Sequence, residues 1–449
     1  MRPEILARYG ARQIPRYTSY PTAPNFTAAV GEGQYRAWLG SVPADESLSL
    51  YLHVPFCRAM CWYCGCHTTV TARALPVARY LDALTSEITL VAQALPHRMT
   101  ARHLHFGGGS PTLIQPPQFL GLMRHLRLCF DLAKDAELAI EIDPRTLDPA
   151  LTAALATGGI NRASIGVQSF DPRVQAAINR VQNFAETADA VAGLRGHGIH
   201  GINFDLIYGL PHQTLTSCLD TVAQAVSLRP DRLSVFGYAH VPGFKKHQRK
   251  IEESALPDPA ARLEQSQAIA GALVDAGYRQ IGLDHFALPD DSLSAAAATG
   301  RLHRNFQGYT TDGCRALIGF GASSIGRLPG GYVQNKVLIS DYQEQVAQGH
   351  LPIARGCAVS VEDNLRGEII ERLMCDYRVD LAEMCADYGA DPVRLAQSAG
   401  LGPLVADGLI ALRGDVVEME ETARPLVRAV AAAFDAYLDN SKTRHALAL

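Results

Sequence analysis

The sequence has no apolar run that reaches the roughly 18 residues of a membrane-spanning helix. Its first residues, Met-Arg-Pro-Glu, do not resemble a secretory signal, and the chain contains neither an internal repeat nor a low-complexity tract. Neither sign of charge dominates, because 41 Lys and Arg stand against 45 Asp and Glu. These absences argue against a membrane protein, a secreted protein and a nucleic-acid-binding protein.

The size and composition indicate a globular protein. Of the 449 residues, 47% are apolar and 19% are charged, so the chain can bury a large core and is expected to form one big domain with smaller additions. Six of the ten cysteines are scattered singly, which does not suggest a disulfide framework. This composition agrees with a cytoplasmic protein, and we expect a monomer.

The other four cysteines lie within ten residues of one another, at Cys57, Cys61, Cys64 and Cys66. Thiolates this close suit a soft metal or an iron–sulfur cluster, and the C-x3-C-x2-C spacing can hold three irons of a cubane. The fourth iron would then be open to a small molecule. A structural zinc site, completed by Cys66 or His67, is the alternative, although such sites usually take two ligand pairs from separated turns.

Between about residues 48 and 240, short apolar runs alternate with longer amphipathic stretches. This βαβ pattern predicts six parallel strands with crossover helices, either as an incomplete barrel or as a doubly wound sheet. The predicted strands are Ser49–His53, His103–Phe106, Leu138–Ile142, Ala163–Val167, Ile202–Tyr208 and Leu233–Tyr238.

Unusual residues follow these strands at their carboxyl ends. They are the cysteine motif, Gly107–Thr112, Asp143, Gln168, Gly209 and Ala239. Parallel α/β folds place their active sites at this edge, so we expect the functional site there.

Several of these residues suggest ligand contacts. The glycines 107–109 allow a backbone to approach a ligand closely. Glu141 is out of place in a strand that is buried on both faces; it either pairs with a buried base or binds a ligand hydroxyl such as a ribose, and we favour the ligand. Asp205 interrupts an apolar strand, and its charge requires a partner. Gln168 and Arg180 are candidates to face the same cavity as Asp205.

The remaining chain is less regular. We predict a helix at Ala260–Ala276, a strand at Gln280–Phe286, a loop at Ser292–Gly300, and surface loops at the basic run Phe244–Lys250 and at His303–Thr311. The predicted segments are an N-terminal arm (1–35) lying over the main domain, the main domain (36–290), a connecting and substrate-site segment (291–360), and a helical C-terminal domain (361–449).

The two terminal segments need separate comment. Residues 361–449 are expected to contain a hairpin across Arg413–Asp415 and a last helix at Ala423–Leu438. This resembles a winged helix, yet the segment has 16 Asp and Glu against 9 Lys and Arg, so a DNA contact is disfavoured and a lid or packing role is expected. The stretch Pro15–Thr22 is too polar and Pro-rich for a core element.

The C-x3-C-x2-C motif is typical of radical S-adenosylmethionine (SAM) enzymes, and the whole chain resembles their oxygen-independent coproporphyrinogen III oxidase family. Three features separate it from the haem-chaperone branch of that superfamily: the extra Cys66, the segment Pro15–Thr22 and the segment His303–Thr311. The matching segments are Pro15–Thr22, Tyr51–Cys66, His105–Thr112, Ile140–Arg145, Gly166–Phe170, Asn179–Arg180, Asp205–Pro211, Asp231–His240, Asp284–Ala287 and His303–Thr311.

The resemblance implies an α/β fold: an incomplete parallel (β/α)6 barrel of the radical SAM type, with an N-terminal arm and a mainly helical C-terminal domain. It implies that Cys57, Cys61 and Cys64 ligate a 4Fe-4S cluster, and that Cys66 and Tyr51 are needed for catalysis, Cys66 without being a ligand. Tyr51, Gly108, Glu141 and Ile325 would hold SAM on the cluster. A second SAM position would be lined by Tyr63, Gly109, Ser110, Gln168, Arg180, Asp205 and Ala239.

The implied reaction is the decarboxylation of two propionates of coproporphyrinogen III to vinyl groups by a 5′-deoxyadenosyl radical, giving protoporphyrinogen IX. An electron donor such as flavodoxin or ferredoxin would supply the cluster. A flat tetra-anion should be held by cations, so Arg16 and Arg304 are predicted substrate residues and the run Lys245–Lys250 is a further candidate. The alternatives are a haem-binding chaperone without turnover, a radical enzyme that opens the haem ring, and a zinc-dependent regulatory protein.

Overall fold

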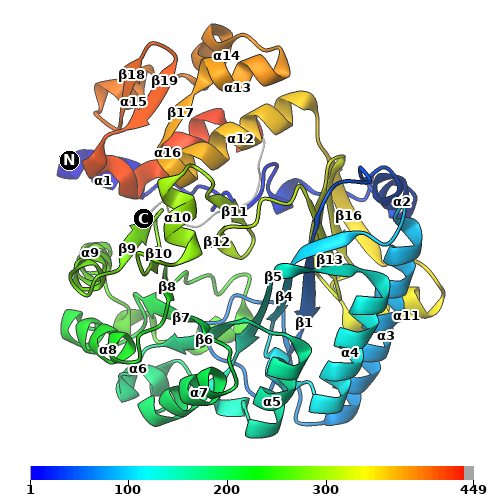
Figure 1. The fold of residues 1–449 in the computed structure, drawn as a ribbon. Coiled ribbons are helices and arrows are strands. Elements are labelled where there is room, and N and C mark those ends of the chain that lie inside the picture. The colour runs from blue at the N-terminus through cyan, green and yellow to red at the C-terminus, as the bar shows by residue number, and fades with distance from the viewer. Residues whose placement is uncertain (1, 439–449) are drawn as a thin grey trace. The chain divides into compact units, whose positions relative to one another are not determined.

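Residues 2–438 are described by the computed structural model, and they divide into two units. The barrel unit comprises Thr27–Gly277 and Cys314–Gly356, and the terminal unit comprises Met1–Phe26, Tyr278–Gly313 and Cys357–Leu449. Each unit is therefore assembled from separated stretches of chain (Figure 1). The four continuous segments predicted from the sequence stay a prediction, since compact units do not by themselves show which segments fold independently.

Six parallel strands form the centre of the barrel unit, and all six predicted strands are confirmed. Strands β4 and β5 begin at Thr100 and Asp131, earlier than the predicted His103 and Leu138, and the last strand ends at Gly237, one residue before the predicted Tyr238. Strand β1 pairs with β4 and β13 and not with β8, so the arc is incomplete as predicted. In their order along the sheet the strands are β1 (Leu48–Val54), β4 (Thr100–Gly108), β5 (Asp131–Ile142), β6 (Arg162–Gln168), β7 (Gly201–Tyr208) and β8 (Arg232–Gly237).

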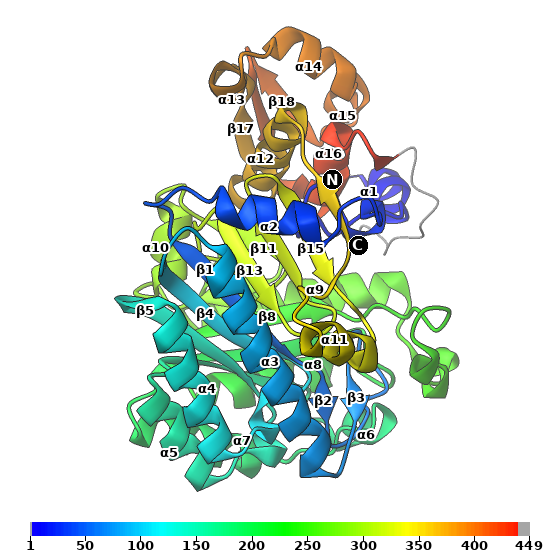
Figure 2. The same cartoon turned by 90° about the vertical axis from the view of Figure 1, so that its right-hand side faces the viewer.

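Amphipathic helices cover the outside of this arc (Figures 1 and 2). In the first of them Leu81, Leu84, Ile88 and Val91 recur at helical spacing and lie on the buried face. Side chains cap several amino ends; for example, Asp148 accepts a hydrogen bond from the Leu151 N–H at 2.7 Å. The helices are α3 (Ala74–Ala94), α4 (Pro116–Cys129), α5 (Pro149–Gly158), α6 (Pro172–Ala177), α7 (Phe184–Gly196), α8 (Leu215–Ser227) and α9 (Pro259–Asp275).

Four further strands extend the sheet beyond β1, and none of them was predicted. Strand β13 runs parallel to β1, and β14 and β15 continue antiparallel from it. These strands have four to six residues and contain glycines, so they show little periodicity before they pair. They are β13 (Ala316–Phe320), β14 (Ile325–Leu328), β15 (Gly331–Asn335) and β16 (Ile353–Ala358), with α11 (Ile339–Ala347) between the last two and α2 (Glu32–Gly40) preceding β1.

Glu87 on α3 joins this extension to the barrel from a buried position. Its carboxylate accepts hydrogen bonds from the Gly321 N–H (2.7 Å), the Tyr342 hydroxyl (2.7 Å) and the Asn335 amide (2.6 Å). Burial raises the pKa of Glu87 to about 7, although these three hydrogen bonds act in the opposite direction. The folded chain therefore favours the protonated carboxyl more than the unfolded chain does.

This raised pKa predicts that stability falls as the pH rises through the acidic range. The unfolded carboxyl loses its proton near 4.5 and the folded one near 7, so the unfolded state binds fewer protons between these values. The free energy of unfolding should drop by roughly 3 kcal/mol across this window through Glu87 alone. Urea unfolding of the wild type and of Glu87→Gln at pH 5 and pH 7.5 measures the difference. Equal pH slopes for the two proteins would contradict the assignment.

The terminal unit contains a helical layer and short strands. Its helices are α1 (Pro3–Gly10), α10 (Ser292–Ala298), α12 (Val361–Asp376), α13 (Leu381–Tyr388), α14 (Pro392–Ala399), α15 (Gly402–Ala406) and α16 (Val427–Ala431). Its strands are β9 (Arg279–Ile281), β10 (His285–Ala287), β11 (His303–Asn305), β12 (Gly308–Thr310), β17 (Arg378–Asp380), β18 (Ile410–Arg413) and β19 (Val416–Met419).

Some predictions for this unit are confirmed and others are wrong. The hairpin across Arg413–Asp415 is formed by β18 and β19. The single strand predicted at Gln280–Phe286 is instead the antiparallel pair β9 and β10, because Gly282 turns the chain at φ +56°. The loop predicted at Ser292–Gly300 is largely the helix α10, and the last helix is broken into shorter pieces around Pro425.

The N-terminal segment contributes to the core of the terminal unit, so the expectation that it is too polar for a core is wrong. Ile14, Tyr17 and Tyr20 are buried in one cluster with apolar residues of α12 and α16. The buried Arg428 side chain donates hydrogen bonds to the carbonyls of Ile14 and Pro15 (3.1 Å for the latter). The polar backbone of this stretch is thereby satisfied while its aromatic rings are buried.

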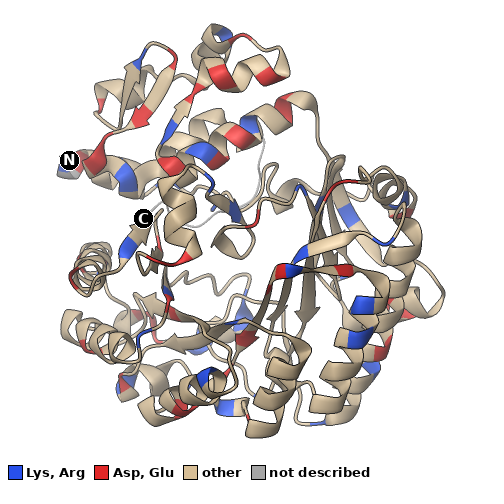
Figure 3. Cartoon of the chain, viewed as in Figure 1, with Lys and Arg blue, Asp and Glu red and all other residues tan. Residues whose placement is uncertain are grey.

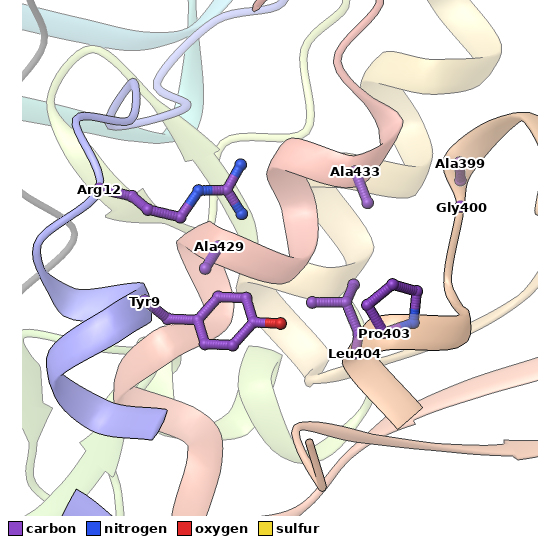
Figure 4. A pocket seen from close by; sticks show the side chains of 8 residues that line it. All are labelled: Tyr9, Arg12, Ala399, Gly400, Pro403, Leu404, Ala429 and Ala433. Carbon is purple, nitrogen blue, oxygen red and sulfur yellow. The ribbon is translucent and has the colours of Figure 1, made fainter. Parts of the chain in front are cut away.

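A pocket of about 240 Å³ lies in the same unit, where Tyr9 and Arg12 reach into it (Figure 4). Its other lining residues are small or apolar, and none was predicted as a site residue: Ala399, Gly400, Pro403, Leu404, Ala429 and Ala433. Within residues 2–438, no helix combines the length and the apolar character that crossing a bilayer requires.

Candidate active site

The four clustered cysteines follow the carboxyl end of β1, and the first of them, Cys57, ends the two-residue strand β2 (Phe56–Cys57). We call residues 57–67 the cysteine loop. All ten cysteines of the chain are free thiols, so no disulfide occupies these four. Cys61 is buried, while Cys57 and Cys64 are half-buried. Three thiols held on one loop without pairing keep their sulfurs available as ligands.

Each of the three sulfurs predicted as ligands has polar partners of its own. Cys57 Sγ is hydrogen-bonded to Thr68 Oγ1 at 3.1 Å and accepts a bond from Ser110 Oγ at 3.6 Å. Cys64 Sγ accepts the Cys66 backbone N–H at 3.4 Å. Hydrogen bonds from Cys66 and the charges of His247 and Lys245 lower the pKa of Cys64 to about 6 against the effect of burial. Donors aimed at sulfur favour the thiolate, the form that binds iron.

Cys61 differs from the other two because its partners are cations. Arg180 Nη1 lies 3.7 Å and Arg145 Nη2 lies 3.9 Å from Cys61 Sγ. Asp143, at the end of β5, fixes Arg145 through two bonds, Nε to Oδ1 at 2.9 Å and Nη2 to Oδ2 at 2.7 Å. Burial raises the pKa of Asp143, but the Arg145 hydrogen bond and the Arg180 charge outweigh it and hold that pKa below its usual range. Two guanidinium groups and one carboxylate thus surround this sulfur.

The glycines after β4 and the carboxylate of Glu141 form a second part of the site. Glu141 Oε2 accepts the Gly108 N–H at 3.1 Å, and Oε1 lies 3.4 Å from His105 Nε2. Glu141 therefore has a base as a partner, one of the two possibilities left open above, while its side chain remains 39% exposed. A Cβ at Gly107 would lie 2.5 Å from Glu141 Oε1, so a side chain at this position would displace the carboxylate.

Tyr51 on β1 lies beside this carboxylate. Its ring stacks on His105 with the ring centroids 5.8 Å apart, and its hydroxyl lies 3.1 Å from His53 Nδ1. The other ring nitrogen of His53 lies 3.0 Å from the His67 carbonyl. Burial lowers the pKa of His53, so a neutral imidazole links Tyr51 to the cysteine loop.

The residues predicted for a second SAM position come from several elements: Tyr63 from the cysteine loop, Gly109 and Ser110 from the turn after β4, Gln168 from the end of β6, Arg180 from the segment after α6, Asp205 from β7 and Ala239 from the segment after β8. Gln168 is buried and adopts φ +68°, an uncommon conformation for a non-glycine residue. Asp205 accepts hydrogen bonds from Ser164 Oγ (3.0 Å) and Asn203 Nδ2 (2.9 Å), so neutral groups are among its partners. Gln248 Nε2 donates to the carbonyls of Tyr63 (3.0 Å) and Ala239 (3.3 Å). Ile325 is the first residue of β14.

The two predicted substrate residues belong to the terminal unit. Arg16 is exposed, whereas the Arg304 side chain is only 6% exposed and its guanidinium carbon lies 4.4 Å from the Tyr309 ring centroid. Arg304 Nη1 is 4.0 Å from Asp284 Oδ1, and Nε and Nη1 are buried without a hydrogen-bond partner. The surface loop predicted at His303–Thr311 is therefore wrong, since β11 and β12 form a hairpin with Arg304 and Tyr309 buried.

The donor set can be tested against the metal alternatives. Across residues 2–438, no three His, Cys, Asp or Glu side chains are arranged to hold one metal ion. The zinc hypothesis requires such a tetrahedral group and gains no support. A cubane is larger than a single ion, so its thiolate ligands stand farther apart, and three sulfurs supplied with separate donors fit it.

Comparison with known proteins settles the family. Residues 51–225 match the Radical SAM superfamily. The chain is 54% identical to the oxygen-independent coproporphyrinogen III oxidase of Bradyrhizobium diazoefficiens, with 100% of both proteins covered. The chain belongs to the oxygen-independent coproporphyrinogen III oxidase family. The corresponding oxidase of Paracoccus denitrificans is 43% identical over 99% of this chain and 98% of its own.

A solved structure agrees with this assignment. Coproporphyrinogen III oxidase from Escherichia coli, described as a radical SAM enzyme, matches with a TM-score of 0.90 and 38% identity, covering 95% of this chain and 100% of that one. Our enzyme is thus a radical SAM oxidoreductase with a 4Fe-4S cluster and SAM as its cofactors. The chaperone, ring-opening and zinc-protein alternatives find no support among these relatives.

Sequence reasoning missed several residues that the site brings together. His53 and His105 flank Tyr51, and Arg145 reaches Cys61. The pairing of Asp143 with Arg145 could have been found from the sequence Asp-Pro-Arg directly after the third predicted strand. The basic run after β8 also contacts the cysteine loop. Its charged composition alone suggests a solvent-exposed surface and does not indicate this contact.

Proposed function

We propose that this enzyme oxidatively decarboxylates two propionate side chains of coproporphyrinogen III to vinyl groups, giving protoporphyrinogen IX in porphyrin and haem biosynthesis. The observation that carries this proposal is the cysteine loop, whose three unpaired sulfurs each have their own donors at the carboxyl edge of a parallel barrel. The full-length similarity to coproporphyrinogen III oxidases supports the choice of substrate.

In this proposal Cys57, Cys61 and Cys64 hold the 4Fe-4S cluster, and Cys66 stays outside the ligand set. Bound together, the cluster and SAM supply the radical chemistry that the side chains themselves lack. The chain holds the cluster thiolates through Thr68, Ser110, Arg145 and Arg180.

The SAM that binds the cluster would be held by Tyr51, Gly108, Glu141 and Ile325. Gly108 fixes the Glu141 carboxylate, which leaves that carboxylate oriented toward a ligand hydroxyl. A second SAM would contact Arg180 and Asp205, whose opposite charges suit a ligand that carries both a carboxylate and cationic groups. The remaining residues of this position are Tyr63, Gly109, Ser110, Gln168 and Ala239.

We further propose that Arg16 and Arg304 hold propionates of the substrate, and that the enzyme is a cytoplasmic monomer with no membrane or nucleic-acid partner. Ten free thiols suit a reducing compartment. The electron for the cluster would come from a small carrier such as flavodoxin or ferredoxin.

Anaerobic incubation with coproporphyrinogen III, SAM and dithionite tests the proposed reaction. Release of protoporphyrinogen IX is expected, and SAM cleavage without any change in the porphyrinogen would contradict it.

Arg16 should affect substrate use without affecting the cofactors. A hydrogen bond to a charged group contributes about 1.5–3 kcal/mol, so Arg16→Ala should weaken substrate affinity roughly ten- to a hundredfold. Iron content and uncoupled SAM cleavage should stay unchanged, and Arg16→Lys should rescue only partly because it lacks the planar fork. Product formation at varied substrate concentration measures the effect.

The matched control is Arg12→Ala, which removes a neighbouring exposed arginine. Deletion of residues 1–22 is unsuitable, because Ile14, Tyr17 and Tyr20 belong to the core of the terminal unit. If Arg16→Ala converts substrate as fast as Arg12→Ala does, the anchor must be sought around Arg304.

Arg145 should set the reduction potential of the cluster. Net charge and hydrogen bonds to cluster sulfurs tune this potential, and Arg145 places a cation 3.9 Å from Cys61 Sγ. Arg145→Gln should therefore lower the midpoint potential by roughly 59 mV or less, at most one tenfold change in a one-electron equilibrium. Anaerobic redox titration followed by electron paramagnetic resonance measures it.

Two further variants serve as comparisons for the reduction potential of Arg145→Gln. Asp143→Asn removes the opposite charge and should raise the potential, whereas the exposed Arg173→Gln on α6 should leave it unchanged. A potential that is identical in wild type and Arg145→Gln would show that Arg145 serves only the fold.

A further inference from the structure

A basic segment after β8, residues 244–250, is held against the cysteine loop by its inward side chains. Lys245 Nζ donates to the Cys66 carbonyl at 3.0 Å, and His247 Nε2 lies 2.7 Å from the Cys64 carbonyl. Gln248 Nε2 donates to the Tyr63 carbonyl at 3.0 Å. The segment therefore lies directly beside the residues that surround the proposed cluster ligand Cys64.

The outward side chains of the same segment combine exposed cations with an exposed aromatic residue. Lys246 and Arg249 are exposed, and Phe244 is 67% exposed. The segment contains no acidic residue; of the two glutamates that follow it, Glu253 pairs with His240 at 3.0 Å and Glu252 accepts a bond from Ser254. Both signs of charge occur on the outer helices of the barrel unit (Figure 3), so this is a local basic patch and not part of a general positive field.

We propose that residues 244–250 dock an acidic one-electron carrier protein that reduces the cluster. This inference rests on the proposed function, which requires one electron from outside for each SAM that is cleaved. In the docked complex the carrier is oxidised by one electron and the cluster is reduced by one, and no bond forms or breaks. Lys246 and Arg249 attract the carrier, and Phe244 supplies the apolar contact.

Other occupants fit the patch less well. An exposed aromatic ring flanked by cations is typical of the central anchors of protein–protein interfaces. A nucleic acid would require a broader basic surface, whereas this chain carries a formal net charge of −4. A solvated face would leave Phe244 in water, whereas a docked protein would bury it beside two attracting cations.

The test separates carrier-dependent from carrier-independent reduction. The double variant Lys246→Glu/Arg249→Glu changes two exposed cations and leaves Lys245, His247 and Gln248 on the loop. With a reduced recombinant flavodoxin of net negative charge at low salt, its cluster should bleach at least tenfold more slowly than that of wild type, because steering by opposite charges raises association rates by one to three orders of magnitude. With dithionite the two clusters should be reduced at equal rates, and high salt should slow the wild type toward the variant.

Binding of the same flavodoxin to cluster-free protein gives a second readout that needs no turnover. Wild type should bind more tightly than the double variant and than Phe244→Ala, and Lys134→Glu, a single charge reversal at the exposed start of β5, should behave as wild type. Equal flavodoxin binding and equal bleaching in the double variant would overturn the docking proposal. Failure of the dithionite-reduced wild type to decarboxylate coproporphyrinogen III would instead overturn the proposed function.

Discussion

Replacement of Cys57, Cys61 or Cys64 by Ala is expected to abolish the cluster and all product formation. Two remaining thiolates cannot hold three irons, so iron should fall from about four per chain to near zero after anaerobic reconstitution, and the brown charge-transfer absorption should disappear. Iron and sulfide analysis together with the visible spectrum measures the loss. The backbone of the loop should persist, because its anchors at residues 245, 247 and 248 bind carbonyl groups and not the thiols.

Cys129→Ala is the matched control, since Cys129 is a half-buried free thiol at the end of α4 in the same unit. It should retain full iron content. Zinc without iron in the anaerobically purified wild type would show that the cluster assignment is wrong and would restore the zinc hypothesis.

Cys66→Ser should separate cluster assembly from catalysis. Residue 66 contacts Cys64 Sγ through its backbone N–H, which serine retains, and through its side chain, where the serine hydroxyl can replace the thiol as donor. The variant should therefore keep its iron, its spectrum and the environment of Cys64. Product formation should nevertheless fall by roughly a hundredfold or more, the range typical of losing a positioned proton-transfer group.

Cys64→Ala provides the comparison for this prediction. If Cys66→Ser loses as much iron as Cys64→Ala, then Cys66 is a fourth thiolate ligand. If it keeps both iron and full activity, the thiol of Cys66 has no role in catalysis.

The barrel strands could be predicted because their information is local. Each strand is a short apolar run between turn residues, and each helix shows its buried face at regular spacing, so β1 and β4 to β8 were found without knowledge of the fold. The short strands β13 to β16 could not be found in the same way. Their stability depends on pairing with β1, a partner far away in the sequence.

The site was predicted in part for similar reasons. Clustered cysteines are visible as a motif, and the position of Glu141 on a buried strand marks it as unusual. By contrast, the contacts of Arg145 with Cys61 and of Lys245 with Cys66 join residues 84 and 179 positions apart. Only the folded barrel brings such pairs together. The charged residues Arg145 and Lys245 taken alone suggest a solvent-exposed surface.

The late position of β13 in the chain has a consequence for biosynthesis. The outer edge of β1 is made early, but the strand that covers it leaves the ribosome only after residue 316. Until then the nascent barrel presents an unpaired apolar strand edge, a site where partly folded chains aggregate. We expect chaperone dependence during translation to end once residues 316–356 have emerged, which ribosome-stalled chains of increasing length would show.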